Sequence, residues 1–109
     1  MESFLSDEQA ITSAELLTLP HLFTGIPIII RFELHCKTAE HGYAIGDIVD
    51  YNSSNQHDSN EGLAVIKDAT NIKIRFGSAA KALKLLNFTT GSGVAITNAN
   101  WKLVVIAFR

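Results

Sequence analysis

The clearest pattern in the chain is a strict alternation of apolar and polar residues within "IIIRFELHCKT". Its apolar members are Ile30, Phe32, Leu34 and Cys36, and its polar members are Arg31, Glu33, His35 and Lys37. Because successive side chains of a strand point to opposite faces, this period of two predicts a strand with one buried face. The beginning of the segment, Ile28 to Ile30, is apolar on both faces.

The last nine residues, "WKLVVIAFR", are apolar on both faces over a longer stretch. Every residue from Leu103 to Phe108 is apolar, whereas a strand with one solvated face should alternate. We therefore expect both faces of this strand to be covered and the start of the first strand to lie near it. Trp101, which opens the segment, is interpreted as a core or interface anchor in preference to a stacking platform for a sugar or base.

The rest of the chain is typical of short strands separated by turns. A strand is expected within "AITSAELLTLP", another from Asp47 to Tyr51, and a hairpin in "LAVIKDATNIKIRFG" with Ile72, Ile74 and Phe76 inward. In "SAAKALKLLNF" a helix competes with a strand, and the strand, Ala82 to Asn87, is preferred because its neighbours are strands. Six to eight strands with frequent turns predict one all-β domain over residues 1–109, an antiparallel β-sandwich in preference to a barrel.

Composition suggests that this domain assembles with copies of itself. Apolar residues make up 47% of the 109 residues and charged residues only 18%, and a small domain with excess apolar surface tends to hide it in a partner. A dimer or trimer that shares the two-sided strands is expected. The predicted interface residues are Ile28, Ile30, Trp101, Val104, Val105, Ile106 and Phe108. The alternative is that a loop or the N-terminal "ESFL" of the same chain covers the second face.

Charge and cysteine content exclude several classes of protein. The net charge of −2, with scattered Lys and Arg, provides no basic stripe for nucleic acid. A lone cysteine cannot form an internal disulfide, and Cys36 is expected to be a small buried hydrophobe. The start "MESFLSDEQA" has acidic residues where a signal peptide needs a basic region and an apolar run, and no stretch is long enough to cross a membrane. Synthesis in a reducing cytosol is expected.

Catalytic and metal-binding motifs are absent from the sequence. There is no nucleophile elbow, no zinc-protease motif and no phosphate-binding loop, so an enzyme is not expected, and neither is a cofactor. The side chains that could gather round a metal are the histidines and acids His21, His35, His41, His57, Asp47, Asp50, Asp58 and Glu61. Scattered histidines of this kind are more typical of solvent-facing or hydrogen-bonded side chains, so no metal is predicted.

A polar loop provides the candidates for binding. The eleven residues "NSSNQHDSNEG" contain no apolar member and are expected to form a surface loop. Loops on a rigid sandwich commonly carry recognition, and amides beside tyrosines suit polar ligands such as glycans. The candidate residues are Tyr43, Tyr51, Asn52, Asn55, His57, Asp58 and Asn60. The alternative is a solvated loop without a partner.

Four segments together resemble a known module. "SDEQAITSAELLTLPH", "CKTAEHGYAIGDIVD", "DATNIKIRFGSA" and "TTGSGVAITNANWKLVVIAFR" are similar to the module at the C-terminal ends of bacteriophage tail-fibre and related virion proteins. The likeness runs from about Ser6 to Arg109, and "CKTAEHGYAIGD" and "TNANWKLVV" are its most specific parts. More loosely, the "F..GIP.I" segment and the Trp-led last strand resemble the H-type lectin arrangement, a trimeric sandwich that binds sugars.

The resemblance implies a non-enzymatic homotrimer of the virion that binds a host-surface glycan, with the last strand near the shared axis. It also implies other virion proteins as partners. The chain departs from the fibre pattern in opening on Met close to the module, without a shaft, and in having "LPHLFTGIP" in place of a more Gly-rich turn. These departures leave open a structural virion subunit, such as a capsid decoration or tail-assembly protein. A cellular lectin-like module also stays open.

Overall fold

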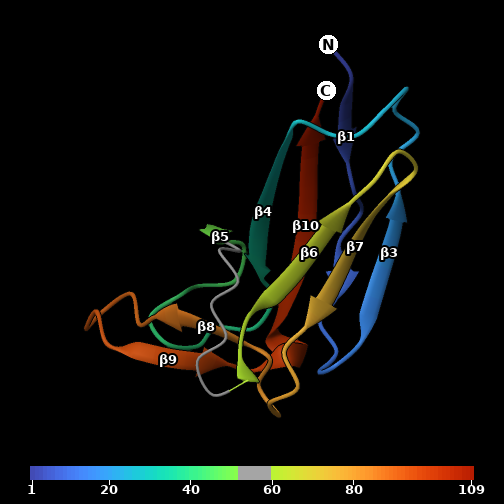
Figure 1. Cartoon of the computed structure of the whole chain (residues 1–109). Helices are drawn as coiled ribbons and strands as arrows, with labels where there is room; N and C mark the ends of the chain where they lie inside the picture. The colour runs from blue at the N-terminus through green and yellow to red at the C-terminus, as the bar shows by residue number, and fades with distance from the viewer. Residues whose placement is uncertain (52–59) are drawn as a thin grey trace.

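The computed structural model describes residues 1–51 and 60–109, and nearly all of their regular structure is antiparallel β-sheet (Figure 1). Within these residues the strands are β1 (Ser3–Leu5), β2 (Gln9–Ala10), β3 (Leu16–Pro20), β4 (Ile29–Cys36), β5 (Ile48–Tyr51), β6 (Leu63–Lys67), β7 (Asn71–Phe76), β8 (Leu83–Leu86), β9 (Gly93–Ile96) and β10 (Trp101–Phe108). The predicted all-β sandwich is confirmed. A 3-10 turn, η2 (Asn98–Asn100), directly precedes β10.

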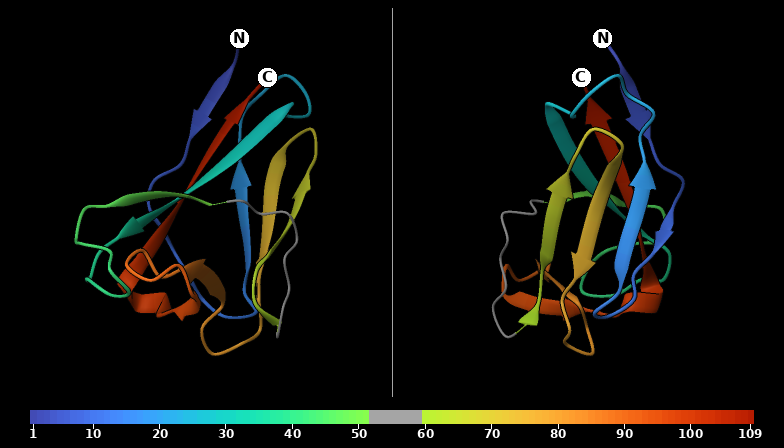
Figure 2. Two further views of the ribbon diagram at one scale, coloured as in Figure 1. Left: turned by 90° about the vertical axis from the view of Figure 1, so that its left-hand side faces the viewer. Right: turned by 45° about the vertical axis from the view of Figure 1, so that its right-hand side comes forward.

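Two sheets form the layers of the sandwich, and a hairpin closes one end. The first sheet has the strand order β1-β10-β4-β5, with β2 also on β10, and the second has the order β3-β7-β6. Figure 2 shows these sheets as two facing layers, with the hairpin β8-β9 across the end opposite both termini. This hairpin covers the open end of the core: Leu83 and Ile96, paired across it, are both buried.

The long strands β4 and β10 lie side by side along their whole length. Their register pairs Cys36 with Trp101 and Ile29 with Phe108, so the expected proximity of the two segments is confirmed. Phe32 and Leu34 face the core, as the alternation predicts. The inward face of β10 is formed by Trp101, Leu103, Val105 and Ala107, all buried in the core of the same chain.

The N-terminal segment extends the first sheet beside β10. Its pairing is interrupted at Ser6, whose Oγ donates to the Asp7 carbonyl and accepts the Val105 N–H at 2.8 Å. A hydroxyl that acts as donor and acceptor satisfies the buried backbone where the ladder breaks. The segment "ESFL", offered as a cover for the second face of β10, therefore pairs along the edge of this strand, while Phe4 packs against the core.

The second sheet confirms the predicted hairpin. In β7, Ile72, Ile74 and Phe76 point into the core, while Lys73 and Arg75 face outward. The turn is held by Asp68, whose Oδ1 accepts the N–H groups of Thr70 and Asn71 at 2.9 and 2.7 Å. These bonds lower the pKa of Asp68, with the Asn71 N–H contributing most. An acidic side chain that caps its own turn is the ordinary role of Asp in this position.

Candidate functional site

The predicted ligand-binding residues fall in three places. Asn52, Asn55, His57 and Asp58 lie outside the described residues. Tyr51 is half-buried on β5, and Asn60 is exposed just before β6. Tyr43 lies apart from them, in the connection after β4. The described candidates therefore do not form one cluster, and each local surface has to be considered by itself.

A hollow of about 630 Å³ lies on the second sheet beside Asn60. Its lining residues are Ala14, Asn60, Glu61, Gly62, Leu63, Ala64, Val65, Ile66, Arg75, Phe76, Gly77 and Ser78. Ala64 and Arg75 are cross-strand partners. The aliphatic part of the Arg75 side chain therefore lies beside a residue whose side chain is a single methyl group. The small side chain of Ala64 leaves the surface open here, whereas a Cβ at Gly77 would meet the Asn60 carbonyl, so this glycine lets the backbone of the rim pack closely. We call this feature the β6-β7 hollow.

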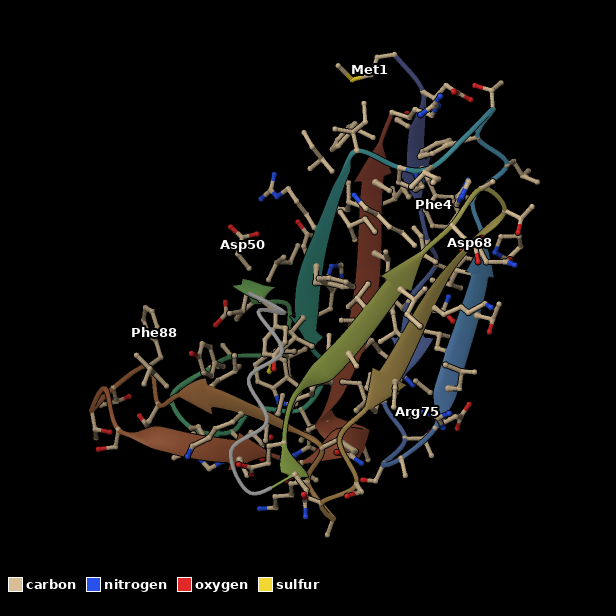
Figure 3. All side chains as sticks on the ribbon, in the orientation of Figure 1. Met1, Phe4, Asp50, Asp68, Arg75 and Phe88 are labelled. Carbon is tan, nitrogen blue, oxygen red and sulfur yellow. The ribbon has the colours of Figure 1, made fainter. Side chains whose placement is uncertain are left out.

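Arg75 is the charged group that the structure fixes in the β6-β7 hollow. Its Nη1 donates to the Ala14 carbonyl at 2.9 Å, which ties the side chain to the turn before β3. Figure 3 shows Arg75 at the lower part of β7, on the side toward β3. Among the described residues no other partner of this guanidinium is found. The remaining N–H groups of the fork can therefore donate to a ligand.

The rim of the hollow adds neutral and acidic polar groups. Asn60 and Ser78 are exposed, and Glu61 is half-buried. The backbone of this rim is rigid, because the Ala79 N–H donates to the Asn60 carbonyl and the Gly77 N–H to the Gly62 carbonyl. Burial raises the pKa of the neighbouring Tyr51, and the Glu61 carboxylate adds to that rise. Tyr51 therefore keeps its phenol proton at neutral pH, but its side chain does not line the hollow.

Tyr43 anchors a second surface, at the β8-β9 hairpin. Its hydroxyl donates to the Leu86 carbonyl at 2.6 Å, and its ring meets Trp101 edge-on with centroids 5.3 Å apart. The ring of Phe88, which is 75% exposed and labelled in Figure 3, lies with its centroid 5.6 Å from that of Tyr43. Burial raises the pKa of Tyr43. This predicted binding residue is therefore occupied as a structural link between the core and the hairpin.

The connection around Tyr43 depends on the absence of a side chain at Gly42, and this can be tested. Gly42 has φ +84°, and a Cβ there would lie 2.5 Å from Thr89 Oγ1 and 2.9 Å from the Thr89 nitrogen. Gly46 has φ +93° with open space around its would-be Cβ. Gly46→Ala should cost about 1 kcal/mol from the left-handed backbone alone, and Gly42→Ala clearly more. Urea unfolding of both variants would measure the difference, and equal losses would contradict the packing argument.

Glu40 forms a compact hydrogen-bonded centre that sequence reasoning missed. Its Oε1 accepts the Thr97 N–H and the Trp101 Nε1–H, each at 2.8 Å, and its Oε2 accepts the Thr97 hydroxyl at 2.9 Å. Burial by itself raises the pKa of Glu40, but the hydrogen bonds outweigh it and the pKa lies below its usual value. These three donors are neutral, and a hydrogen bond from the Asn100 side chain also lowers the pKa of this carboxyl. The arrangement makes Glu40 a structural acceptor that holds η2 and Trp101 in place.

The outer face of the first sheet carries exposed apolar side chains at the end near the termini. Leu5 pairs with Ile106, and Ile29 pairs with Phe108, so the four share one face. Leu5 is 71% and Ile29 is 51% exposed, while Ile106 and Phe108 are half-buried. We call these four residues the outer apolar patch. Monomeric proteins seldom leave contiguous apolar surface of this kind uncovered.

Part of the predicted interface is corrected by burial. Trp101 and Val105 are 0% exposed and belong to the core of the chain itself, and Ile30 faces the same core. A partner cannot reach Trp101 and Val105, because the second sheet and the hairpin already cover them, and Ile30 is half-buried against the same core. Of the other predicted residues, Val104 lies on the outer face but is only 4% exposed, whereas Ile28 is 67% exposed. Ile28, Ile106 and Phe108 therefore remain as interface candidates beside the outer apolar patch.

The same face of the sheet becomes polar further from the termini. His35 Nδ1 lies 3.0 Å from Glu8 Oε2, and its Nε2 lies 3.1 Å from Glu33 Oε1. Lys37 donates to Glu8, and this hydrogen bond is the chief reason that the pKa of Glu8 is lowered. Nearby, Arg31 pairs with Asp50 at 3.2 Å. These polar groups pair with one another within the chain. The outer apolar patch is therefore the part of this face that a partner would cover.

Histidine and cysteine have structural partners in the described part of the chain. His21 accepts the Phe23 N–H on Nδ1, and its Nε2 lies 2.9 Å from the Asp68 carbonyl. Cys36 is buried, and burial raises the pKa of its thiol. Over residues 1–51 and 60–109, no group of three or more metal-ligating side chains is arranged around one point, and no helix is long and apolar enough to cross a membrane. His57 and Asp58 lie outside these residues.

Comparisons with known proteins found no matching family model, no matching curated protein and no matching solved structure. The resemblance to the phage module therefore stays a prediction from the sequence.

Proposed function

We propose that this chain is a non-enzymatic, trimeric module of a bacteriophage particle that attaches to a glycan on the host surface. The outer apolar patch is the observation that carries the assembly part of this proposal. It lies over β1, β10 and β4, the region from which the sequence predicts shared strands. Second and third copies of the chain are the proposed cover, because the charges beyond the patch are already paired internally and offer little to a charged partner.

The β6-β7 hollow supports the recognition part of the proposal. It lies on the second sheet, whereas the outer apolar patch lies on the outward face of the first sheet. Assembly through one sheet would thus leave the hollow of each copy open to a ligand. Three weak sites on one particle gain strength through avidity, which suits a shallow recognition site without catalytic groups.

A structural virion subunit is the alternative function, and one observation favours it. Leu86 and Phe88 are 61% and 75% exposed at the β8-β9 hairpin, far from the outer apolar patch (Figure 1). Two separated apolar surfaces suit a subunit that joins two different neighbours, as a decoration or tail-assembly protein does. In that function the glycan would be absent and other virion proteins would be the ligands.

The assembly can be tested by light scattering of Leu5→Asp. We expect the native chain to show a mass near three times the 11.9 kDa of one chain, and Leu5→Asp to show the monomer mass with unchanged circular dichroism. Leu5 is 71% exposed, so a charge there costs the isolated monomer little. Leu86→Asp is the matched control, since it adds the same charge at an exposed site on the hairpin. A native monomer would contradict the proposed assembly.

Attachment can be tested with the purified native protein on host cells and on a glycan array. Binding to both supports the receptor-binding function. If neither binds while the protein binds purified virions that lack it, the structural alternative replaces the proposed function.

A further inference from the structure

We propose that the β6-β7 hollow binds a sugar that carries a carboxylate, and that Arg75 is the residue that selects it. This inference rests on the proposed glycan-binding function and names the class of glycan. The hollow has the size of ordinary small-ligand sites, about 300–1,000 Å³, at about 630 Å³. Of the residues of the hollow, the sequence singled out only Asn60 for ligand binding and Glu61 as a candidate metal ligand, and Arg75 for neither.

The guanidinium of Arg75 is preorganised for a carboxylate. The bond from Nη1 to the Ala14 carbonyl fixes the side chain, so less conformational entropy is lost when a ligand binds. Two N–H groups of a guanidinium fork match the two oxygens of a carboxylate, and such charge-assisted pairs are roughly twice as strong as neutral hydrogen bonds. The Arg75 stem lies beside Ala64, which leaves space for a carboxylate above the small residue.

The other groups of the hollow point to a sugar and away from a simple anion. Ala64 and Ile66 offer an apolar floor for the less polar face of a pyranose ring, and both are exposed. Asn60 and Ser78 can exchange hydrogen bonds with sugar hydroxyls. The carboxylate of Glu61 accepts hydrogen bonds from sugar hydroxyls, and its negative charge disfavours highly charged ligands such as nucleic acid and polyphosphates more than a sugar with a single carboxylate. A sialic acid or a uronic acid combines one carboxylate with several hydroxyls, which is the combination that these residues recognise.

The experiment is an NMR titration of the native protein with 3′-sialyllactose against lactose, and with a glucuronic-acid disaccharide against its glucose counterpart. We expect only the acidic sugars to bind, with shifts at the amides of Gly62, Gly77 and Ser78. Arg75→Gln should weaken the acidic sugars at least about tenfold, because it removes a hydrogen-bonded charge. Lys73→Gln is the matched control: it removes the same charge from the same strand, outside the hollow, and should leave affinity unchanged.

A second variant guards against misfolding of Arg75→Gln. Ala64→Glu places a carboxylate directly opposite Arg75 on the neighbouring strand, where it should pair with the guanidinium and block the ligand. Because Ala64 is exposed, this variant should keep the native melting temperature while losing the acidic sugars. Retained binding in Ala64→Glu would overturn the proposed site.

The outcomes separate this inference from the proposed function. Equal binding of neutral and acidic sugars, or acidic binding that Arg75→Gln leaves intact, overturns the role of Arg75 but leaves glycan attachment standing. No binding of any of these sugars, with host-cell attachment preserved, overturns the inference alone. No sugar binding together with no host-cell attachment overturns both.

Discussion

Val105→Asp is expected to prevent folding of the chain. Val105 is 0% exposed at the centre of β10 and faces the core between the two sheets. The substitution buries a carboxylate without a partner, and we expect it to cost more than about 4 kcal/mol, close to the whole stability of a small domain. Far-UV circular dichroism and the dispersion of amide NMR signals would both be lost.

Two companion variants show whether this loss comes from the core. Val105→Ala, which removes two methyl groups without adding charge, should cost about 2 kcal/mol and leave a folded protein. Ile106→Asp, on the opposite face of the same strand, should keep the fold and act on assembly as Leu5→Asp does. A folded Val105→Asp with an altered mass would contradict the placement of Val105 in the core and return it to the interface.

Glu40→Ala is expected to destabilise the chain by about 2–4 kcal/mol. The substitution leaves the Thr97 N–H, the Thr97 hydroxyl and the Trp101 Nε1–H without their acceptor, and each buried donor that loses its partner costs about 1–3 kcal/mol unless water replaces it. Urea unfolding followed by Trp101 fluorescence would measure the loss. Glu40→Gln should cost less, because its amide oxygen can still accept two of the three bonds.

The pH dependence of the same variants tests the charge of Glu40. The pKa of Glu40 is lowered in the folded chain, so its contribution to stability is present above the unfolded value, near 4.5, and is lost as the pH falls below it. Glu40→Gln should therefore lose less stability between pH 6 and pH 3 than the native chain. Glu2, Glu8 and Asp68 also have lowered pKa values, so the slope should shrink without vanishing. An unchanged slope would contradict the charged state of Glu40.

The sequence predicted the strands in which buried and exposed residues alternate. It missed the short strands that form only because an adjacent strand pairs with them. Strand β4 and the β6-β7 hairpin were found because Leu34 and Ile74 fall on strict alternations. Strands β1 and β2 are too short to show a period, and they form because β10 offers them an edge. For "SAAKALKLLNF", local propensity favours a helix, but the strand expected from its neighbours is confirmed as β8, which pairs with β9.

The candidate site was less predictable, because the register between β6 and β7 determines which side chains lie next to one another in it. The alternation placed Arg75 outward, but no pattern reveals that Ala64 lies opposite it or that its guanidinium reaches Ala14, 61 residues away. Asn60 was found through its polar surroundings. Val105 was assigned to the interface because its segment is apolar on both faces, and composition cannot tell which of two apolar faces meets its own core.

The pairing of the two ends of the chain has a mechanical consequence. The Glu2 N–H donates to the Arg109 carbonyl at 2.8 Å, and the Arg109 N–H donates to the Glu2 carbonyl at 2.9 Å, so both termini leave the molecule from the same end (Figure 1). A force applied between the two termini would peel β1 from β10 one bond at a time. A force between the C-terminus and Cys36, the end of β4 that pairs with Trp101, would instead shear β10 against β4. In that geometry eight residue pairs share the load. The fold should therefore resist a force applied along β10 and β4 far better than a force that separates the N-terminus from the C-terminus.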